Sequence, residues 1–177
     1  MELWDLYNIH RERTSEKLVR GNPIPDGRYR LVVHVCVFNS DGQMLIQHRQ
    51  PTKAAWPDLW DVSVGGAVVS GETSILAAHR ETLEEIGLDI DFSGCAPSFS
   101  VTFPDGFDDF YIVHKDVEIS ALTLQETEVQ AAKWASLQEI LAMIDAGTFI
   151  PYCKSFLEFL FFRSTHPGIR TTGSTKV

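Results

Sequence analysis

Cysteine is scarce in this sequence of 177 residues, with three copies far apart at Cys36, Cys95 and Cys153. An odd number of cysteines without any CxxC pair argues against a disulfide framework and against a zinc site built on thiolates. Cys36 stands in the apolar run LVVHVCVF. We therefore expect Cys36 to be a free thiol in the core.

Long hydrophobic segments are also missing. No run reaches the eighteen or more apolar residues that a transmembrane helix needs. The first ten residues, MELWDLYNIH, lack the basic and long apolar regions of a secretory signal peptide. These absences predict a cytoplasmic protein with no membrane partner.

Positive charge is in short supply, since 15 Lys and Arg stand against 24 Asp and Glu and give a formal net charge of −9. General binders of nucleic acids usually show a basic face, so we expect no nucleic-acid partner. The shortage is uneven, because residues 1–53 hold 8 basic and 6 acidic residues and the remainder holds 7 and 18. Scattered surface charge and a metal site facing an anionic ligand both explain this distribution.

The length and the hydrophobic content of 44% suit one globular domain. Apolar and β-branched segments predict strands at 3–9, 29–38, 44–49, 61–64, 98–103, 109–118 and 129–136. Apolar periodicity predicts helices at 74–86, 136–147 and 151–162. This order indicates one layered α/β domain over residues 1–165, followed by a polar tail at 166–177.

The helix at 74–86 carries an unusual cluster of charge. Thr73 is a suitable N-cap, and Gly87 is a suitable C′ residue with positive φ. At about 100° per residue, three glutamates share one arc of the helix: Glu81, Glu84 and Glu85. We expect the opposite face to be buried, since it carries the aliphatic residues Ile75, Leu76, Leu83 and Ile86.

The glutamates lie near the helix C-terminus, where the helix dipole disfavours anions. A hard divalent cation would remove this penalty, because oxygen ligands spaced i, i+3 and i+4 suit Mg²⁺ or Mn²⁺. Ala77 and Ala78 would let the backbone of Gly65-Gly66 approach the carboxylates closely. A solvated acidic helix face is the alternative, and the spacing alone leaves both interpretations open.

The segment around these glutamates resembles the Nudix box, G-x5-E-x7-R-E-U-x-E-E-x-G-U, where U is aliphatic. Seven fixed positions match: Gly66, Glu72, Arg80, Glu81, Glu84, Glu85 and Gly87. Thr82 departs from the pattern, but it lies on the face expected to be buried, so we interpret it as a packing change. The resemblance implies a Nudix fold, an α/β/α sandwich with a mixed central sheet, with the box at residues 66–88.

The resemblance also implies an activity, namely that of a metal-dependent Nudix hydrolase acting on acid anhydrides in phosphorus-containing compounds. Such a pyrophosphohydrolase cleaves a diphosphate linkage in a nucleoside diphosphate derivative by attack of water at phosphorus. Position by position, Glu81, Glu84 and Glu85 would bind Mg²⁺ or Mn²⁺ with the carbonyl of Gly65. Glu72 and Arg80 would form a structural pair.

Further roles follow from the same resemblance. Glu81 and Glu84 are candidate catalytic residues together with a later carboxylate, for which Glu128 is favoured over Glu126. Arg49 stands where the family often places an arginine near substrate phosphates, although a plain surface arginine fits as well. Trp56 and Trp60, the segment 103–110 and the N-terminal segment would line the substrate pocket. The group attached to the diphosphate is not readable, and a homodimer is left open.

Segments at the N-terminus and at WPDLWDVSVGGAV resemble the bacterial subgroup similar to isopentenyl diphosphate isomerase. An isomerase would need a cysteine at Gly65 and histidines at Ala67 and Arg30, so isomerisation is disfavoured. A non-catalytic nucleotide-sensing module is also disfavoured, because such modules usually lose glutamates of the box. Hydrolysis is the function that the residues favour.

Overall fold

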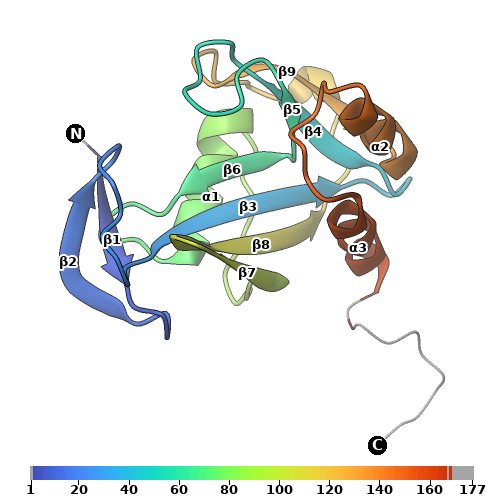
Figure 1. Cartoon of the computed structure of the whole chain (residues 1–177). Helices are drawn as coiled ribbons and strands as arrows, with labels where there is room; N and C mark the ends of the chain where they lie inside the picture. The colour runs from blue at the N-terminus through green and yellow to red at the C-terminus, as the bar shows by residue number, and fades with distance from the viewer. Residues whose placement is uncertain (1, 167, 169–177) are drawn as a thin grey trace, which may run out of the picture.

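The computed structural model describes residues 2–166 and Gly168 (Figure 1). An N-terminal hairpin of β1 (Leu3–Tyr7) and β2 (Arg13–Val19) forms its own antiparallel sheet at one end of the molecule. Within the described residues, the main sheet has seven strands: β3 (Arg30–Phe38), β4 (Met44–Arg49), β5 (Trp60–Asp61), β6 (Val64–Ala67), β7 (Phe99–Phe103), β8 (Gly106–His114) and β9 (Val129–Ala135). The helices are α1 (Ser74–Ile86), α2 (Leu137–Asp145) and α3 (Lys154–Thr165), with a 3₁₀ turn, η1, at Ile119–Ala121.

The main sheet is mixed. Strand order is β5-β4-β3-β8-β7, with β6 paired to β3 and β9 paired to β4. β3 and β8 run parallel, whereas the other pairs are antiparallel. The predicted hairpin between β3 and β4 pairs only at Phe38 and Met44. Beyond that point the two strands separate, because β6 pairs with β3 and β9 pairs with β4.

Alternation along β3 divides the core into two layers. Val33, Val35 and Val37 pack with residues of α1, whereas Cys36 and Phe38 pack with residues of α2 and α3. Figure 1 shows α1 behind the sheet and α3 in front of it. The predicted α/β/α sandwich with a mixed sheet is therefore confirmed, and so is the buried, free Cys36.

Some boundaries differ from the prediction. The strand expected at 61–64 is two short strands, β5 and β6, that pair with different neighbours. β8 begins at Gly106, not at residue 109, because it forms a tight hairpin with β7 in which Phe103 opposes Gly106. β2 was not predicted, because most of its side chains are exposed in a two-stranded sheet with one open side.

The N-terminal hairpin is bonded to the loop that precedes α1. Asp5 on β1 accepts hydrogen bonds from Ser70 Oγ and Gly71 N, both at 2.8 Å. Ser70 N also donates to the Leu3 carbonyl at 2.7 Å. At the other end, Arg11 pairs with the buried Asp109 of β8 at 2.8 Å, and Asp109 also accepts from Ser74 Oγ at 2.7 Å. These bonds place the hairpin beside the start of α1.

The predicted polar tail, residues 166–177, lies outside the described residues except for His166 and Gly168. Over the part of the chain that is described, none of the helices is long and apolar enough to cross a membrane.

Candidate active site

α1 has the predicted ends. Leu76 N donates to Thr73 Oγ1 at 3.3 Å, so Thr73 is the N-cap. Gly87 adopts the left-handed conformation with φ 70° and its N–H donates to the Leu83 carbonyl at 3.1 Å. A residue with a side chain would be strained at that φ, which is why a glycine ends this helix.

The buried face of α1 is only partly the one predicted, since Ile86 is fully buried and Ile75 packs against the core. Leu76 and Leu83 are 54% and 46% exposed, whereas Glu85 is only 5% exposed. The residues that contact the sheet are small or lie beside the glutamates: Ala77, Ala78, Thr82 and Ile86, all fully buried. The sheet therefore meets the helix on its carboxylate side, because small side chains there allow β6 to come close. Thr82 is buried as expected.

Gly66 and Glu81 are in very close contact. A Cβ built on Gly66 would lie 2.1 Å from Cδ of Glu81, well inside any allowed contact. The carboxylate of Glu81 therefore occupies the space that a side chain at Gly66 would fill. The absence of a side chain at position 66 allows the glutamate to lie between helix and strand.

Replacing Gly66 with Ala is expected to reduce turnover by about tenfold or more, because the added methyl group must displace the Glu81 carboxylate and small misplacements at a reacting centre are costly. Gly168, where a Cβ meets nothing within 4 Å and φ lies outside the left-handed region, provides a matched control as Gly168→Ala. Steady-state assays of both variants, with thermal unfolding to check folding, make the comparison. Full activity of Gly66→Ala would contradict the tight packing.

The glutamates of α1 line one cleft of about 200 Å³, here called the acidic cleft. It brings together Glu81, Glu84, Glu85 and Glu128, and its other wall is the β6 segment Gly65–Ala67. The remaining lining residues are Glu2, Arg20, Lys53, Arg80 and Gln125. Glu126, the alternative to Glu128, is exposed and does not line the cleft.

Glu85 is the most buried of these acids. Its Oε2 accepts from Gln47 Nε2 at 3.0 Å and from Gly65 N at 3.4 Å. Burial, assisted by the nearby Glu81, raises the pKa of Glu85 to about 7. The pKa of Glu81 is also raised by burial, although Arg80 opposes this shift. The two carboxylates therefore share a site in which their charged forms are unfavourable without a cation.

Arg80 connects the acids of the box. It binds Glu72 through Nε–Oε1 at 2.8 Å and Nη2–Oε2 at 2.9 Å. Its Nη1 lies 2.9 Å from Glu81 Oε1 and 3.2 Å from Glu84 Oε2. The Glu72 carboxylate is the main reason that the pKa of Arg80 lies above its usual value. The bidentate pair joins the loop before α1 to the helix, as expected for a brace.

Because Glu81 and Glu84 turn toward Arg80, no three acidic, histidine or cysteine side chains among the described residues converge on a single point for a metal ion. The chemistry of the cleft nevertheless fits a hard divalent cation, since five carboxylates line it and burial raises the pKa of two of them. Glu81, Glu84 and Glu85 are the residues that could hold the ion.

Lys53 and Glu128 form an ion pair at the rim of the acidic cleft. Burial, followed by the nearby charge of Arg49, lowers the pKa of Lys53. Lys53 was not predicted to be a site residue. The sequence feature that could have indicated it is its place in the loop QPTKAAW, which begins directly after Arg49.

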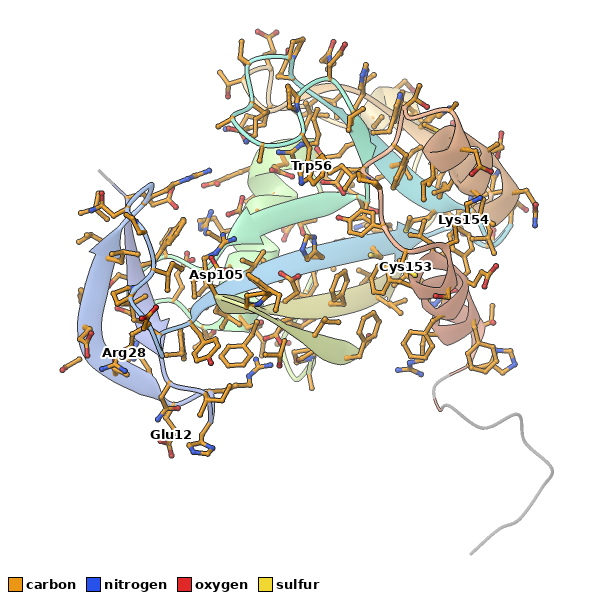
Figure 2. All side chains as sticks on the ribbon, viewed as in Figure 1. Glu12, Arg28, Trp56, Asp105, Cys153 and Lys154 are labelled. Atoms are coloured by element: carbon orange, nitrogen blue, oxygen red, sulfur yellow. The ribbon has the colours of Figure 1, made fainter. Side chains whose placement is uncertain are left out.

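A second cavity of about 510 Å³ adjoins the acidic cleft and shares Gly65, Gly66, Ala67 and Arg20 with it. We call it the arginine pocket, because Arg20, Arg30 and Arg49 line it. Its other lining residues are Trp4, Val32, His34, Trp56, Asp61, Asp108, Ile150, Pro151 and Tyr152. The predicted Trp56 is thus present, half-exposed on the loop between β4 and β5 (Figure 2).

Arg49 lines this pocket but is already bonded within the protein. It donates to the carbonyls of Ala55 at 3.1 Å and Trp56 at 3.3 Å, and to Asp61 Oδ2 at 3.4 Å. Asp61 in turn accepts from Tyr152 at 2.8 Å. Phe107 and Phe110 of the segment 103–110, in contrast, are buried in the core.

Residues 28–153 match the sequence model of the NUDIX domain family. The chain belongs to the Nudix family. An uncharacterized Nudix hydrolase of Listeria monocytogenes is 48% identical over 161 residues, which cover 91% of this chain and 94% of the relative. A crystal structure from Deinococcus radiodurans has a TM-score of 0.70 and 31% identity, covering 93% of this chain and all of the other. The chain is a Nudix hydrolase, as the box predicted.

A more distant relative among Nudix-related proteins is the isopentenyl-diphosphate Delta-isomerase of Brevibacterium linens. It is 35% identical over 116 residues, 63% of this chain and 64% of the relative. The predicted resemblance to that subgroup is therefore present. Nudix enzymes generally use divalent metal ions and act on small phosphate compounds.

Proposed function

We propose that this Nudix hydrolase is a Mg²⁺- or Mn²⁺-dependent pyrophosphohydrolase that cleaves a nucleoside diphosphate derivative by attack of water at phosphorus. The observation that supports this most is the acidic cleft, in which Glu81, Glu84, Glu85 and Glu128 line one small cavity. The arginine pocket next to it has the size and the aromatic and basic lining for the rest of such a substrate.

In this proposal Glu81, Glu84 and Glu85 hold the ion, with the Gly65 carbonyl as a further ligand. The ion, when bound, supplies stabilisation of negative charge on the phosphate oxygens and makes water more acidic. Glu81 and Glu84, which now pair with Arg80, would have to turn toward the ion, and the bonds of Arg80 to Glu72 would still hold the loop and helix together.

Glu128 is the proposed general base. It lines the acidic cleft, and the ion pair with Lys53 orients its carboxylate. A charged carboxylate can accept the proton of the attacking water. Lys53 and Arg49 place positive charge beside the diphosphate, and Trp56 offers an exposed ring to the group attached to it.

The residues favour hydrolysis over isomerisation. Gly65 has no thiol to protonate an alkene, and Ala67 and Arg30 cannot replace the two histidine ligands of an isomerase. A nucleotide sensor without catalysis is the other alternative, and the full set of carboxylates in the cleft argues against it.

A substrate panel tests this proposal. Nucleoside diphosphates, nucleotide sugars, dinucleoside polyphosphates, a coenzyme A ester and isopentenyl diphosphate are incubated with and without Mg²⁺, and phosphate products are measured. We expect at least one nucleoside diphosphate derivative to be cleaved only when Mg²⁺ or Mn²⁺ is present. Tight nucleotide binding without cleavage would favour the sensor, and conversion of isopentenyl diphosphate to its allylic isomer would overturn the argument from Gly65.

A further inference from the structure

Arg30, at the start of β3, presents a positive charge to the arginine pocket. Its guanidinium carbon lies 5.3 Å from the ring centroid of Trp4 and 5.4 Å from that of Phe103. Contacts of this kind hold a guanidinium in place without neutralising it. The Arg30 backbone N–H is bonded to the Asp105 carbonyl at 3.0 Å, which fixes the start of the strand.

Arg30 differs from the other arginines in residues 2–166. Each of the others bonds to a carboxylate or to a backbone carbonyl: Arg11, Arg13, Arg20, Arg28, Arg49, Arg80 and Arg163. No carboxylate or carbonyl within that range accepts a hydrogen bond from the Arg30 side chain. In a chain with a formal net charge of −9, an arginine without an acidic partner is unexpected.

The other arginines and the aspartates of the pocket each have a polar partner within the protein. Asp61 is bonded to Arg49 and Tyr152, and Asp108 Oδ1 lies 3.4 Å from His34 Nε2. Arg20 pairs with Glu2 at 2.9 Å. Arg30 is therefore the arginine of this pocket whose side chain has no hydrogen-bonded or ion-paired partner among the described residues.

The position of Arg30 relative to the acidic cleft limits what it could bind. Gly65, Gly66 and Ala67 form a wall common to both cavities, so a substrate with its diphosphate in the acidic cleft extends across this wall into the arginine pocket. Arg30 lines only the arginine pocket, whereas Lys53 lines the acidic cleft. Arg30 is thus placed for a group of the substrate other than the diphosphate.

We propose that Arg30 determines specificity by binding a second anionic group, a phosphate monoester or a carboxylate, on the part of the substrate beyond the scissile diphosphate. This inference rests on the proposed function, because it assumes that the diphosphate occupies the acidic cleft. A guanidinium is suited to both anions, since its fork of donors matches two oxygens at once.

Three pairs of commercial compounds, each pair differing in one anionic group, test the proposal. They are NADPH and NADH, coenzyme A and dephospho-coenzyme A, and UDP-glucuronate and UDP-glucose. Each compound is measured with Mg²⁺ as kcat/KM where it is hydrolysed and as Kd by calorimetry where it is not. In at least one pair we expect the anionic member to be favoured about tenfold or more.

In Arg30→Gln we expect that ratio to fall close to one. For the member without the extra anion, kcat/KM or Kd should stay within about twofold of its value in the unaltered protein. Arg30→Met keeps apolar contact with Trp4 and Phe103, and we expect its ratio to fall close to one as well. This result would show that the charge of Arg30, and not its packing, causes the preference for the anionic member. Arg28→Gln is the matched control, because Arg28 lies beside the N-terminal hairpin, pairs with Glu16 and does not line the pocket (Figure 2).

Several outcomes would overturn the proposal: a ratio near one in all three pairs for the unaltered protein, a ratio that survives Arg30→Gln, or an equal loss for both members of a pair. The last result would assign Arg30 to the shared diphosphate. A ratio that depends on Arg30 in compounds that are bound but never hydrolysed would refute the proposed function and leave this inference standing. Hydrolysis of these compounds without a ratio that depends on Arg30 would support the proposed function and refute this inference.

Discussion

Glu85→Gln is expected to lower kcat/KM for the best substrate of the panel at least about 100-fold, because a neutral amide cannot replace a charged oxygen ligand of a divalent ion. The change is nearly isosteric, and the amide can still bond to Gln47, which lies 3.0 Å from the carboxylate. Steady-state kinetics over a range of Mg²⁺ concentrations measure the effect. Part of the loss should be recovered at high Mg²⁺ if ion affinity is what has changed.

Glu158→Gln is the control for this experiment, since Glu158 is an exposed glutamate on α3, far from the cleft lining. It removes the same charge and should leave kcat/KM within about twofold, because exposed charges act weakly over distance. Glu81→Gln should behave like Glu85→Gln. Equal activity of Glu85→Gln and Glu158→Gln would remove Glu85 from the proposed ion site.

The second large effect concerns stability without metal. The free energy of unfolding of the protein in EDTA is expected to fall as pH rises between about 4.5 and about 7, because the buried Glu85 has a pKa of about 7 in the folded chain and an ordinary value of 4.5 otherwise. In that window the folded state binds more protons than the unfolded state. The contribution of Glu85 to stability is therefore fully present below pH 4.5 and is lost as pH rises through its folded pKa.

The gap between these two pKa values corresponds to a loss of about 3 kcal/mol in the free energy of unfolding at pH 8. Urea unfolding at several pH values, with and without Glu85→Gln, isolates this contribution from that of other groups. The variant should be more stable than the unaltered protein at pH 8 and similar to it at pH 4.5. Saturating Mg²⁺ should stabilise the unaltered protein at pH 8 and the variant much less. Identical pH profiles for the two proteins would show that Glu85 is not buried in its charged form.

Together these two experiments describe one property of the cleft. A carboxylate that destabilises the metal-free fold and is needed for turnover belongs to a site that has been kept for a ligand. A glutamate with a purely structural role would lower stability when replaced and would leave metal dependence unchanged.

Local chemistry made much of α1 predictable. Thr73 and Gly87 end the helix through bonds within a few residues of themselves, and the spacing of the glutamates follows from the pitch of a helix. The layered α/β fold was also predictable, because the apolar run in β3 is long enough to be buried on both faces. The Nudix box also identified the family, because its residues lie close together in the chain.

Only part of the buried face of α1 was predictable from the helix, where Ile86 and Thr82 are buried as expected. Leu76 and Leu83 were expected to be buried for their hydrophobicity, but they are exposed, and Ala77 and Ala78 are buried instead, since small side chains let the sheet approach the helix closely. β2 was missed for a related reason, since its side chains are mostly exposed and its place depends on pairing with β1.

The sequence by itself determined the fold family, the ends of α1 and the identity of the clustered carboxylates, because each depends on residues near one another in the chain. Only the tertiary structure decided that Glu128 and Lys53 join that cluster, that Glu81 occupies the space above Gly66, and that Arg30 lacks an acidic partner. The reason is physical. These are contacts between strands, helix and hairpin far apart in sequence, and their distances exist only once the sheet and α1 have packed.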